Sequence, residues 1–133
     1  MAIRFELVAD AVSDLEALVA SGNIRLFLVK LVRLEGVGKD AGQPLGNQLT
    51  GLRKIVVGDR NGRIIFKMNT EDTVATVWVI GDRNDSECYE DAVRRLKEAG
   101  DSQPDASGLA SVVLSVMGRR FARRKRSGKN GGR

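Results

Sequence analysis

The feature that most restricts the fold of this chain is a succession of three short apolar runs between residues 51 and 95. The runs occupy residues 54–57, 63–66 and 74–80, and they are rich in valine and isoleucine. Short segments containing glycine, asparagine and aspartate separate them, which is typical of antiparallel strands joined by tight turns. The stretch therefore predicts a meander of antiparallel strands.

Cationic side chains gather at the ends of these predicted strands. Arg53 and Lys54 open the first strand, Arg63 opens the second, and Arg83 follows the third. A sheet that brings cations from neighbouring strands together offers an anion a rigid binding site. Each side chain also has an ordinary interpretation as a solvated charge or as half of an ion pair, the latter above all for Arg83 between two nearby aspartates.

The segment before the meander predicts a helical cover for one face of the sheet. Residues 3–8 alternate apolar and charged side chains, as in a strand at or near a sheet edge. Two amphipathic helices follow, the first capped by Asp10 or Ser13 and the second beginning near Asn23. Because a tight turn at Gly22 joins them, we expect an antiparallel helical hairpin. The predicted fold class is α+β, with this hairpin packed on a twisted antiparallel sheet of about four strands.

The other segments complete this predicted architecture. Residues 36–51 contain five glycines and are expected to form a loop. After the meander, residues 86–99 predict a helix with Asp85 or Ser86 as its cap and with an apolar face that includes Cys88. Trp78, within the third run, is expected to lie in the core.

The positive charge of the chain is confined to its C-terminal end. The net charge is +5, but residues 119–133 carry eight lysines and arginines and no acidic residue, which leaves residues 1–118 with a net charge of −3. We expect one domain over residues 1–100, a linker with an additional helix over residues 101–118, and then a disordered basic tail. The tail is suited to RNA phosphates, to an acidic partner, or simply to solubility.

The scarcity of cysteine and histidine excludes several kinds of chemistry. Cys88 is the only cysteine and the chain has no histidine, so an intrachain disulfide, a His/Cys zinc site and a His-activated nucleophile are all excluded. We therefore expect no metal and no other cofactor. The chain has neither an apolar run long enough to span a bilayer nor the layout of a secretory signal. These features predict a cytoplasmic protein without a membrane partner.

Three segments resemble the RelE/ParE superfamily of toxins from bacterial toxin–antitoxin pairs. They are Gly-Leu-Arg-Lys-Ile at residues 51–55, Asn-Gly-Arg-Ile-Ile-Phe at residues 61–66, and Arg-Asn-Asp-Ser-Glu-Cys-Tyr-Glu-Asp-Ala-Val-Arg-Arg-Leu at residues 83–96. The element order over residues 3–98 is similar too, and the third segment looks like the RelE branch. That branch enters the ribosomal A site and cleaves messenger RNA. The resemblance thus implies a translation-inhibiting, metal-independent endoribonuclease (an mRNA interferase) whose partners are the ribosome, messenger RNA and a cognate antitoxin.

The resemblance also assigns catalytic roles. Lys54 matches a lysine that lines the site and Arg63 an arginine that clamps the phosphate. Arg83 matches an arginine that assists the leaving group, and Tyr89 an aromatic residue that stacks on or orients a base. Such an enzyme needs a base for the 2′-hydroxyl, cations for the phosphorane charge and an acid for the leaving oxygen, and it forms a 2′,3′-cyclic phosphate. Further RNA contacts are predicted for Arg53, Arg60, Lys67, Arg119, Arg120, Arg123, Arg124, Lys125 and Arg126.

One departure from the family pattern keeps two alternatives open. The ribonucleases of the family often carry a second lysine, proposed as the base, at the position where this chain has Val56. The ParE branch, which poisons DNA gyrase, lacks the full ribonuclease set, so Val56 favours a gyrase inhibitor. It also favours a catalytically degenerate module that binds RNA or a partner protein, whereas Arg83 and Tyr89 favour the ribonuclease. Tyr89 has a structural alternative as well, because a tyrosine at that point of a helix commonly packs against the core.

Overall fold

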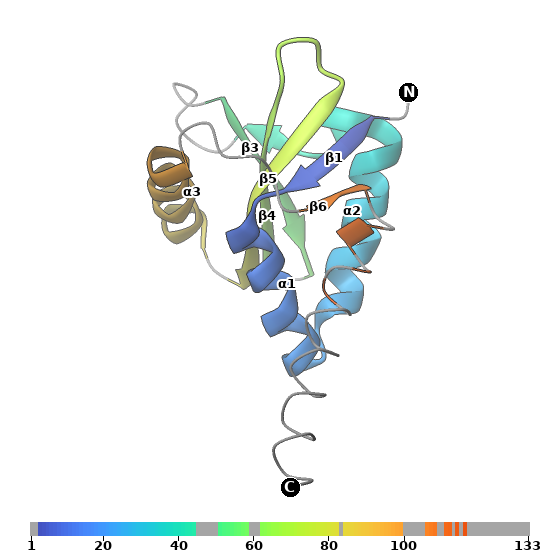
Figure 1. Cartoon of the computed structure of the whole chain (residues 1–133), viewed down its shortest axis with the longest axis vertical. Helices are drawn as coiled ribbons and strands as arrows, with labels where there is room; N and C mark the ends of the chain where they lie inside the picture. The colour runs from blue at the N-terminus through green and yellow to red at the C-terminus, as the bar shows by residue number, and fades with distance from the viewer. Residues whose placement is uncertain are drawn as a thin grey trace, which may run out of the picture.

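The computed structural model of the chain is an α+β domain built on one sheet (Figure 1). It describes residues 3–44, 51–58, 62–82, 84–99 and 106–108, together with residues 111, 112, 114 and 116. The elements in chain order are β1 (Arg4–Leu7), α1 (Ala9–Ser21), α2 (Ile24–Val37), the 3-10 helix η1 (Gly38–Ala41), β2 (Gln43–Pro44), β3 (Leu52–Val57), β4 (Gly62–Met68), β5 (Val74–Asp82), α3 (Asp85–Ala99) and β6 (Ala106–Ser107). No helix of these described residues is both long enough and apolar enough to cross a membrane.

The predicted meander is confirmed, since β3, β4 and β5 are consecutive antiparallel neighbours. The sheet nevertheless has six strands in the order β2-β3-β4-β5-β1-β6, two of which are only two residues long. Strand β1 runs parallel to β5, so the expectation of a wholly antiparallel sheet was wrong. The reason is that alternation of apolar and charged side chains defines a strand and its buried face, but neither its neighbour nor its direction.

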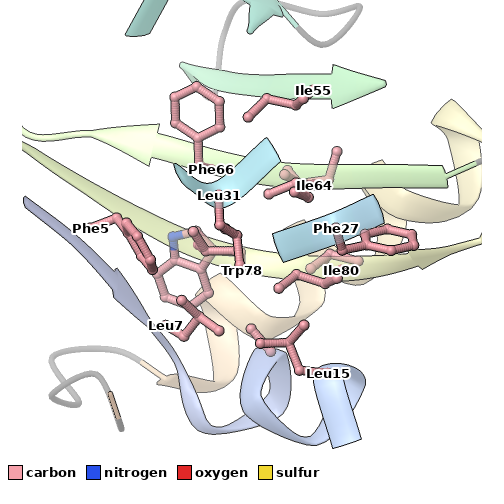
Figure 2. Close-up of a cluster of buried hydrophobic side chains, with 14 of the residues drawn as sticks. Phe5, Leu7, Leu15, Phe27, Leu31, Ile55, Ile64, Phe66, Trp78 and Ile80 are labelled. Atoms are coloured by element: carbon pink, nitrogen blue, oxygen red, sulfur yellow. The ribbon is translucent and has the colours of Figure 1, made fainter. Parts of the chain in front are cut away.

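The helical hairpin and α3 lie on opposite sides of the sheet (Figure 1). On the hairpin side, Phe27, Leu31 and Leu34 of α2 are almost completely buried, as the helical spacing of the sequence predicted. Figure 2 shows Phe27 and Leu31 in one cluster with side chains from β1, β3, β4 and β5. Each such side chain stabilises the fold by about 1.5–3 kcal/mol through burial, so this cluster holds the sheet rigid beneath the opposite face.

The joint between α1 and α2 has the geometry that the sequence predicted. Gly22 adopts a left-handed conformation with φ of 84°, and its N–H and that of Asn23 bond back to the last turn of α1. The start of α1 differs from the expectation. Val8 is the residue before the first turn and provides no side-chain cap, whereas Asp10 lies within that turn. The prediction of a cap at Asp10 or Ser13 was therefore wrong, because the helix begins directly after β1.

The segment predicted as a loop over residues 36–51 is partly regular. Helix α2 continues to Val37, η1 follows it, and β2 pairs with β3. Gly42 is required at this point because a Cβ there would lie 2.5 Å from the Lys54 carbonyl oxygen. Residues 45–50 lie outside the described residues. The close pairing beside Gly42 places β2 at the edge of the sheet next to Lys54.

The described residues after α3 belong to the same packed body. Strand β6 pairs antiparallel with β1, and Val112 and Val116 are buried in the common core. Figure 1 shows this part of the chain, in orange, beside α2. The expected linker at residues 101–105 and the basic tail lie outside the described residues. The segment after α3 thus contributes to the core of the domain.

Candidate functional site

The register of β3 and β4 brings two of the predicted site residues to one face of the sheet. Lys54 is opposite Ile65, and Val56 is opposite Arg63. Residues opposite each other in an antiparallel pair point to the same face, so Lys54 and Arg63 are diagonal neighbours on the face that α3 covers. Val56 lies between them on that face, where it directly adjoins Arg63.

Asp85 at the start of α3 completes a cluster with these two cations. Lys54 Nζ donates to Asp85 Oδ2, and Arg63 Nε donates to Asp85 Oδ1 at 2.7 Å. The side chains of Lys54 and Arg63 are only 15% and 12% exposed, whereas that of Asp85 is 44% exposed. Asp85 is thus the most exposed of the three side chains.

The cap of α3 explains why the Asp85 side chain is available for this role. The Asn84 side chain accepts a hydrogen bond from Glu87 N–H at 2.9 Å, and Asn84 N–H donates to the Glu87 carboxylate at 3.3 Å. This reciprocal pair is a capping box. The predicted cap at Asp85 or Ser86 was therefore wrong by one or two residues, and the Asp85 carboxylate turns toward the sheet instead of toward its own helix.

The electrostatics of the cluster favour bound negative charge. Hydrogen bonds from Lys54 and then from Arg63 hold the pKa of the Asp85 carboxyl below its ordinary value of 3.8. The three side chains carry a net charge of +1 at neutral pH, and the first turn of a helix adds a further positive field. An ammonium that donates to a carboxylate has no lone pair with which to accept a proton. In this arrangement Lys54 and Arg63 both donate hydrogen bonds to one anion.

Other predicted site residues lie at varying distances from this cluster. Tyr89 is one helical turn beyond Asp85 on the same side of α3, and it is partly buried against the core. Lys67 is exposed and shares the face of Arg63, but it lies at the far end of β4. Arg53 points to the opposite face, where its guanidinium donates to the carbonyl oxygens of Lys39 at 3.2 Å and Gly42 at 2.9 Å.

Several of the predicted residues lie outside the part of the chain that the structure describes. These are Arg60, Arg83, Arg119, Arg120, Arg123, Arg124, Lys125 and Arg126. Their roles remain predictions from the sequence.

A second cluster of charged side chains, which the sequence analysis did not identify, anchors the other half of α3. Arg95 donates to Asp14 of α1 at 2.8 Å and to the Trp78 carbonyl oxygen of β5 at 2.8 Å. Asp14 in turn accepts the N–H of Ile80 at 2.9 Å. Burial lowers the pKa of Arg95, but the hydrogen bond to Asp14 and the charges of Asp14, Asp10 and Asp91 together outweigh burial and raise the pKa above its ordinary value.

This second cluster forms hydrogen bonds with the backbone of the sheet. Strand β1 ends at Leu7, opposite Val77, whereas β5 continues to Asp82. The pairing of β5 with β4 also shifts at this point, so that Trp78 has no opposite residue in β4. Arg95 and Asp14 bond the backbone groups of β5 beyond the end of β1. Arg95 and Asp14 are too far apart in the chain to form a local sequence pattern. Only the charges of these two residues and their apolar sequence neighbours could have suggested that they form an ion pair.

The fold that carries these clusters is that of the RelE toxins. A solved structure of the E. coli toxin RelE, a mutant with two arginine-to-alanine substitutions in the free state, matches this chain with a TM-score of 0.56 and 23% sequence identity. The match covers 72% of this chain and 99% of the RelE chain. No protein-family model and no curated protein matches the sequence. The similarity confirms the predicted RelE-like α+β fold.

Proposed function

We propose that this chain is a RelE-like toxin that cleaves messenger RNA on the ribosome, and that Lys54 and Arg63 stabilise the charge of the phosphorane. The observation that carries the proposal is the convergence of these two cations on one rigid sheet face, at the positions that the sequence resemblance assigns to the site. Tyr89, one helical turn beyond Asp85, supports it because an aromatic ring beside a phosphate site suits an unstacked RNA base.

The proposed reaction needs no metal. The 2′-oxygen attacks the adjacent phosphorus, its proton passes to a base, and the departing 5′-oxygen receives a proton from an acid. The products are a 2′,3′-cyclic phosphate and a free 5′-hydroxyl. Preorganised cations such as Lys54 and Arg63 act on the charge that develops on the phosphoryl oxygens. We assign the acid to Arg83, following the resemblance, and the base to a group that the ribosome or the RNA brings.

A gyrase-directed toxin is the second candidate, and Val56 favours it. Val56 lies between Lys54 and Arg63, where the ribonucleases of the family often have a further lysine, and an aliphatic side chain cannot take a proton. A binding module without catalysis is consistent with the same residue. The three alternatives predict different effects in a cell: loss of protein synthesis, loss of DNA synthesis, or neither.

The test is induction of the chain alone in a bacterial host, with pulse labelling of protein and DNA synthesis. Prompt loss of protein synthesis together with cleaved messages would support the ribonuclease. Arrest of DNA synthesis first would support the gyrase inhibitor, and no effect on either would leave the binding module. The matched control is a Lys54→Met, Arg63→Met variant, which we expect to lose the effect on protein synthesis while keeping its fold.

We further propose that the antitoxin docks on the outer face of α2. Leu26, Val29 and Val32 follow each other at intervals of three residues on this face and are 56%, 59% and 50% exposed. Arg25 and Arg33 are exposed on the same face, and each lies about one turn of helix from Val29. Three large aliphatic side chains exposed within two turns of a helix are typical of an interaction surface.

The positive charge of this face indicates that the segment that binds it is an acidic amphipathic helix. A second copy of the chain would bring Arg25 and Arg33 against their own equivalents, and the basic tail at residues 119–133 carries charge of the same sign. An apolar stripe flanked by aspartate or glutamate would satisfy both the aliphatic and the cationic groups. We expect a Val29→Asp variant to stay toxic but to escape neutralisation when the antitoxin is co-expressed. Neutralisation equal to that of the wild type would contradict the docking site.

A further inference from the structure

The Asp85 carboxylate binds its two cations much as a phosphate would. Its two oxygens accept separately from Lys54 and Arg63, so that one bidentate anion bridges β3 and β4. It also sits in the first turn of the 15-residue helix α3, where the helix field favours an anion. The β3–β4 face and the start of α3 together therefore form an anion site, which the chain fills with its own side chain.

Exposure indicates how an external anion would reach this site. Lys54 and Arg63 are nearly buried, and Asp85 is the most exposed of the three side chains. A phosphate approaching from solvent therefore meets the Asp85 side chain before it meets the cations. A phosphate that enters between Lys54 and Arg63 therefore competes with the Asp85 carboxylate for the N–H groups that these two side chains direct at it.

We propose that Asp85 is an internal competitor of the RNA phosphate and sets the affinity of the Lys54–Arg63 site for its substrate. An incoming phosphodiester displaces the carboxylate from both cations, and Asp85 reoccupies them when the RNA leaves. The identity of the ligand as RNA rests on the proposed function. The competition itself concerns any phosphate group and is measurable without cleavage.

The expected size of the effect follows from charge. With Asp85 ionised the three side chains carry +1, and without it they carry +2. One unit charge at about 4 Å changes the affinity for a monoanion by about fivefold even in water, and by more where solvent is partly excluded. An Asp85→Asn substitution removes this charge but keeps the shape of the side chain and one acceptor oxygen.

The experiment is a titration of the 15N-labelled full-length chain with inorganic phosphate, followed by NMR at the Arg63 Nε–H signal. This signal reports on the site itself, so phosphate bound elsewhere on the chain does not contribute to the measured affinity. We expect Asp85→Asn to bind phosphate about five- to tenfold more tightly than the wild type. The control is Glu90→Gln, which removes one negative charge from an exposed position of α3 outside the cluster; its affinity should stay near that of the wild type.

Two results would overturn the proposal. An unchanged or weaker affinity in Asp85→Asn would mean that the carboxylate does not compete, and an equal gain in Glu90→Gln would mean that only net charge matters. A Lys54→Met, Asp85→Asn double variant provides a further test, because the gain in phosphate affinity should be smaller when one of the released cations is absent.

The wild type provides a second measurement in case Asp85→Asn fails to fold. At saturating phosphate, the 13C signal of the Asp85 carboxyl should move toward that of a free carboxylate, and an unmoved signal would contradict displacement. The outcome is also separable from the proposed function. If Asp85 competes with phosphate but RNA is not cleaved, Asp85 controls a site for another phosphate ligand. If RNA is cleaved but Asp85 does not compete, the proposed ribonuclease stands and the proposed role of Asp85 is wrong.

Discussion

Helix α3 is tied to the rest of the domain at two places, and the two sets of ion pairs have opposite charge balances. Near its start, Asp85 forms ion pairs with two cations, and the Asp85 side chain is 44% exposed. Farther along, Arg95 serves Asp14 at 2.8 Å and Asp10 at 3.6 Å, and the side chains of Arg95 and Asp14 are only 11% and 15% exposed. The first cluster has a cation in excess, and the second has an acid in excess.

The difference suits the Arg95–Asp14 cluster to anchoring α3, and the Lys54–Arg63–Asp85 cluster to exchanging its anion, as proposed above. The side chains of Arg95 and Asp14 also bond the backbone of β5, so every change there disturbs the sheet. In the cluster near the start of α3, the Asp85 carboxylate accepts from the side chains of Lys54 and Arg63, and Arg63 also donates to the Gly62 carbonyl oxygen at 3.0 Å. Asp85 is the most exposed of the three side chains. Substitutions in the two clusters should therefore affect different properties of the protein.

The largest loss of stability is expected from Arg95→Met. This substitution leaves Asp14 as a nearly buried charge without its main partner and frees the Trp78 carbonyl group, so we expect the free energy of unfolding to fall by about 3 kcal/mol. Urea unfolding followed by circular dichroism measures the change. A loss no larger than that of Lys54→Met would remove the distinction between the two clusters.

The largest loss of activity is expected from Arg63→Met. Removing one preorganised charge-stabilising group lowers catalysis by roughly 100-fold or more, whereas the partial exposure of Asp85 limits the loss of stability to about 1 kcal/mol. The rate of message cleavage by purified protein on programmed ribosomes measures the first effect. Arg95→Met, assayed at a temperature where it remains folded, is the control and should keep most of its activity.

A gain is expected from Val56→Lys. The new side chain would lie on the face of Lys54 and Arg63, where an additional amine supplies either a base or further positive charge, so we expect cleavage to rise about tenfold. The matched control is Val57→Lys on the opposite, buried face of β3, which should lower stability without any gain. Unchanged cleavage by Val56→Lys would favour the gyrase-directed or binding alternatives.

The smallest effect concerns pH. Because the folded state lowers the pKa of Asp85, the stabilisation by its ion pairs is present above the ordinary value of 3.8 and is lost as the pH falls through the lower folded value. Wild type should exceed Asp85→Asn in the free energy of unfolding by at most about 1 kcal/mol near neutral pH. Parallel urea titrations of the two proteins should show this difference shrinking in acid; a difference that grows in acid would contradict the assignment.

The two clusters also show what the sequence could and could not predict. Lys54 and Arg63 were predictable as neighbours, because the meander and its period of two place them on one face. Asp85 was expected to cap its helix, but the spacing of Asn84 and Glu87 is that of a capping box, and this local signal could have assigned the cap to Asn84. Arg95 and Asp14 are 81 positions apart, and no pattern of spacing connects them. The parallel pairing of β1 with β5 was missed for the same reason, since the choice of partner depends on the assembled core.

The most direct test of the central claim compares messenger RNA on ribosomes with the same RNA free in solution, each exposed to the purified wild-type chain. We predict cleavage on the ribosome, fragments that end in a 2′,3′-cyclic phosphate, and no such fragments from a folded Lys54→Met, Arg63→Met variant. Intact message with the wild type, or equal cleavage by the variant, would contradict the account of the β3–β4 face as a ribonuclease site.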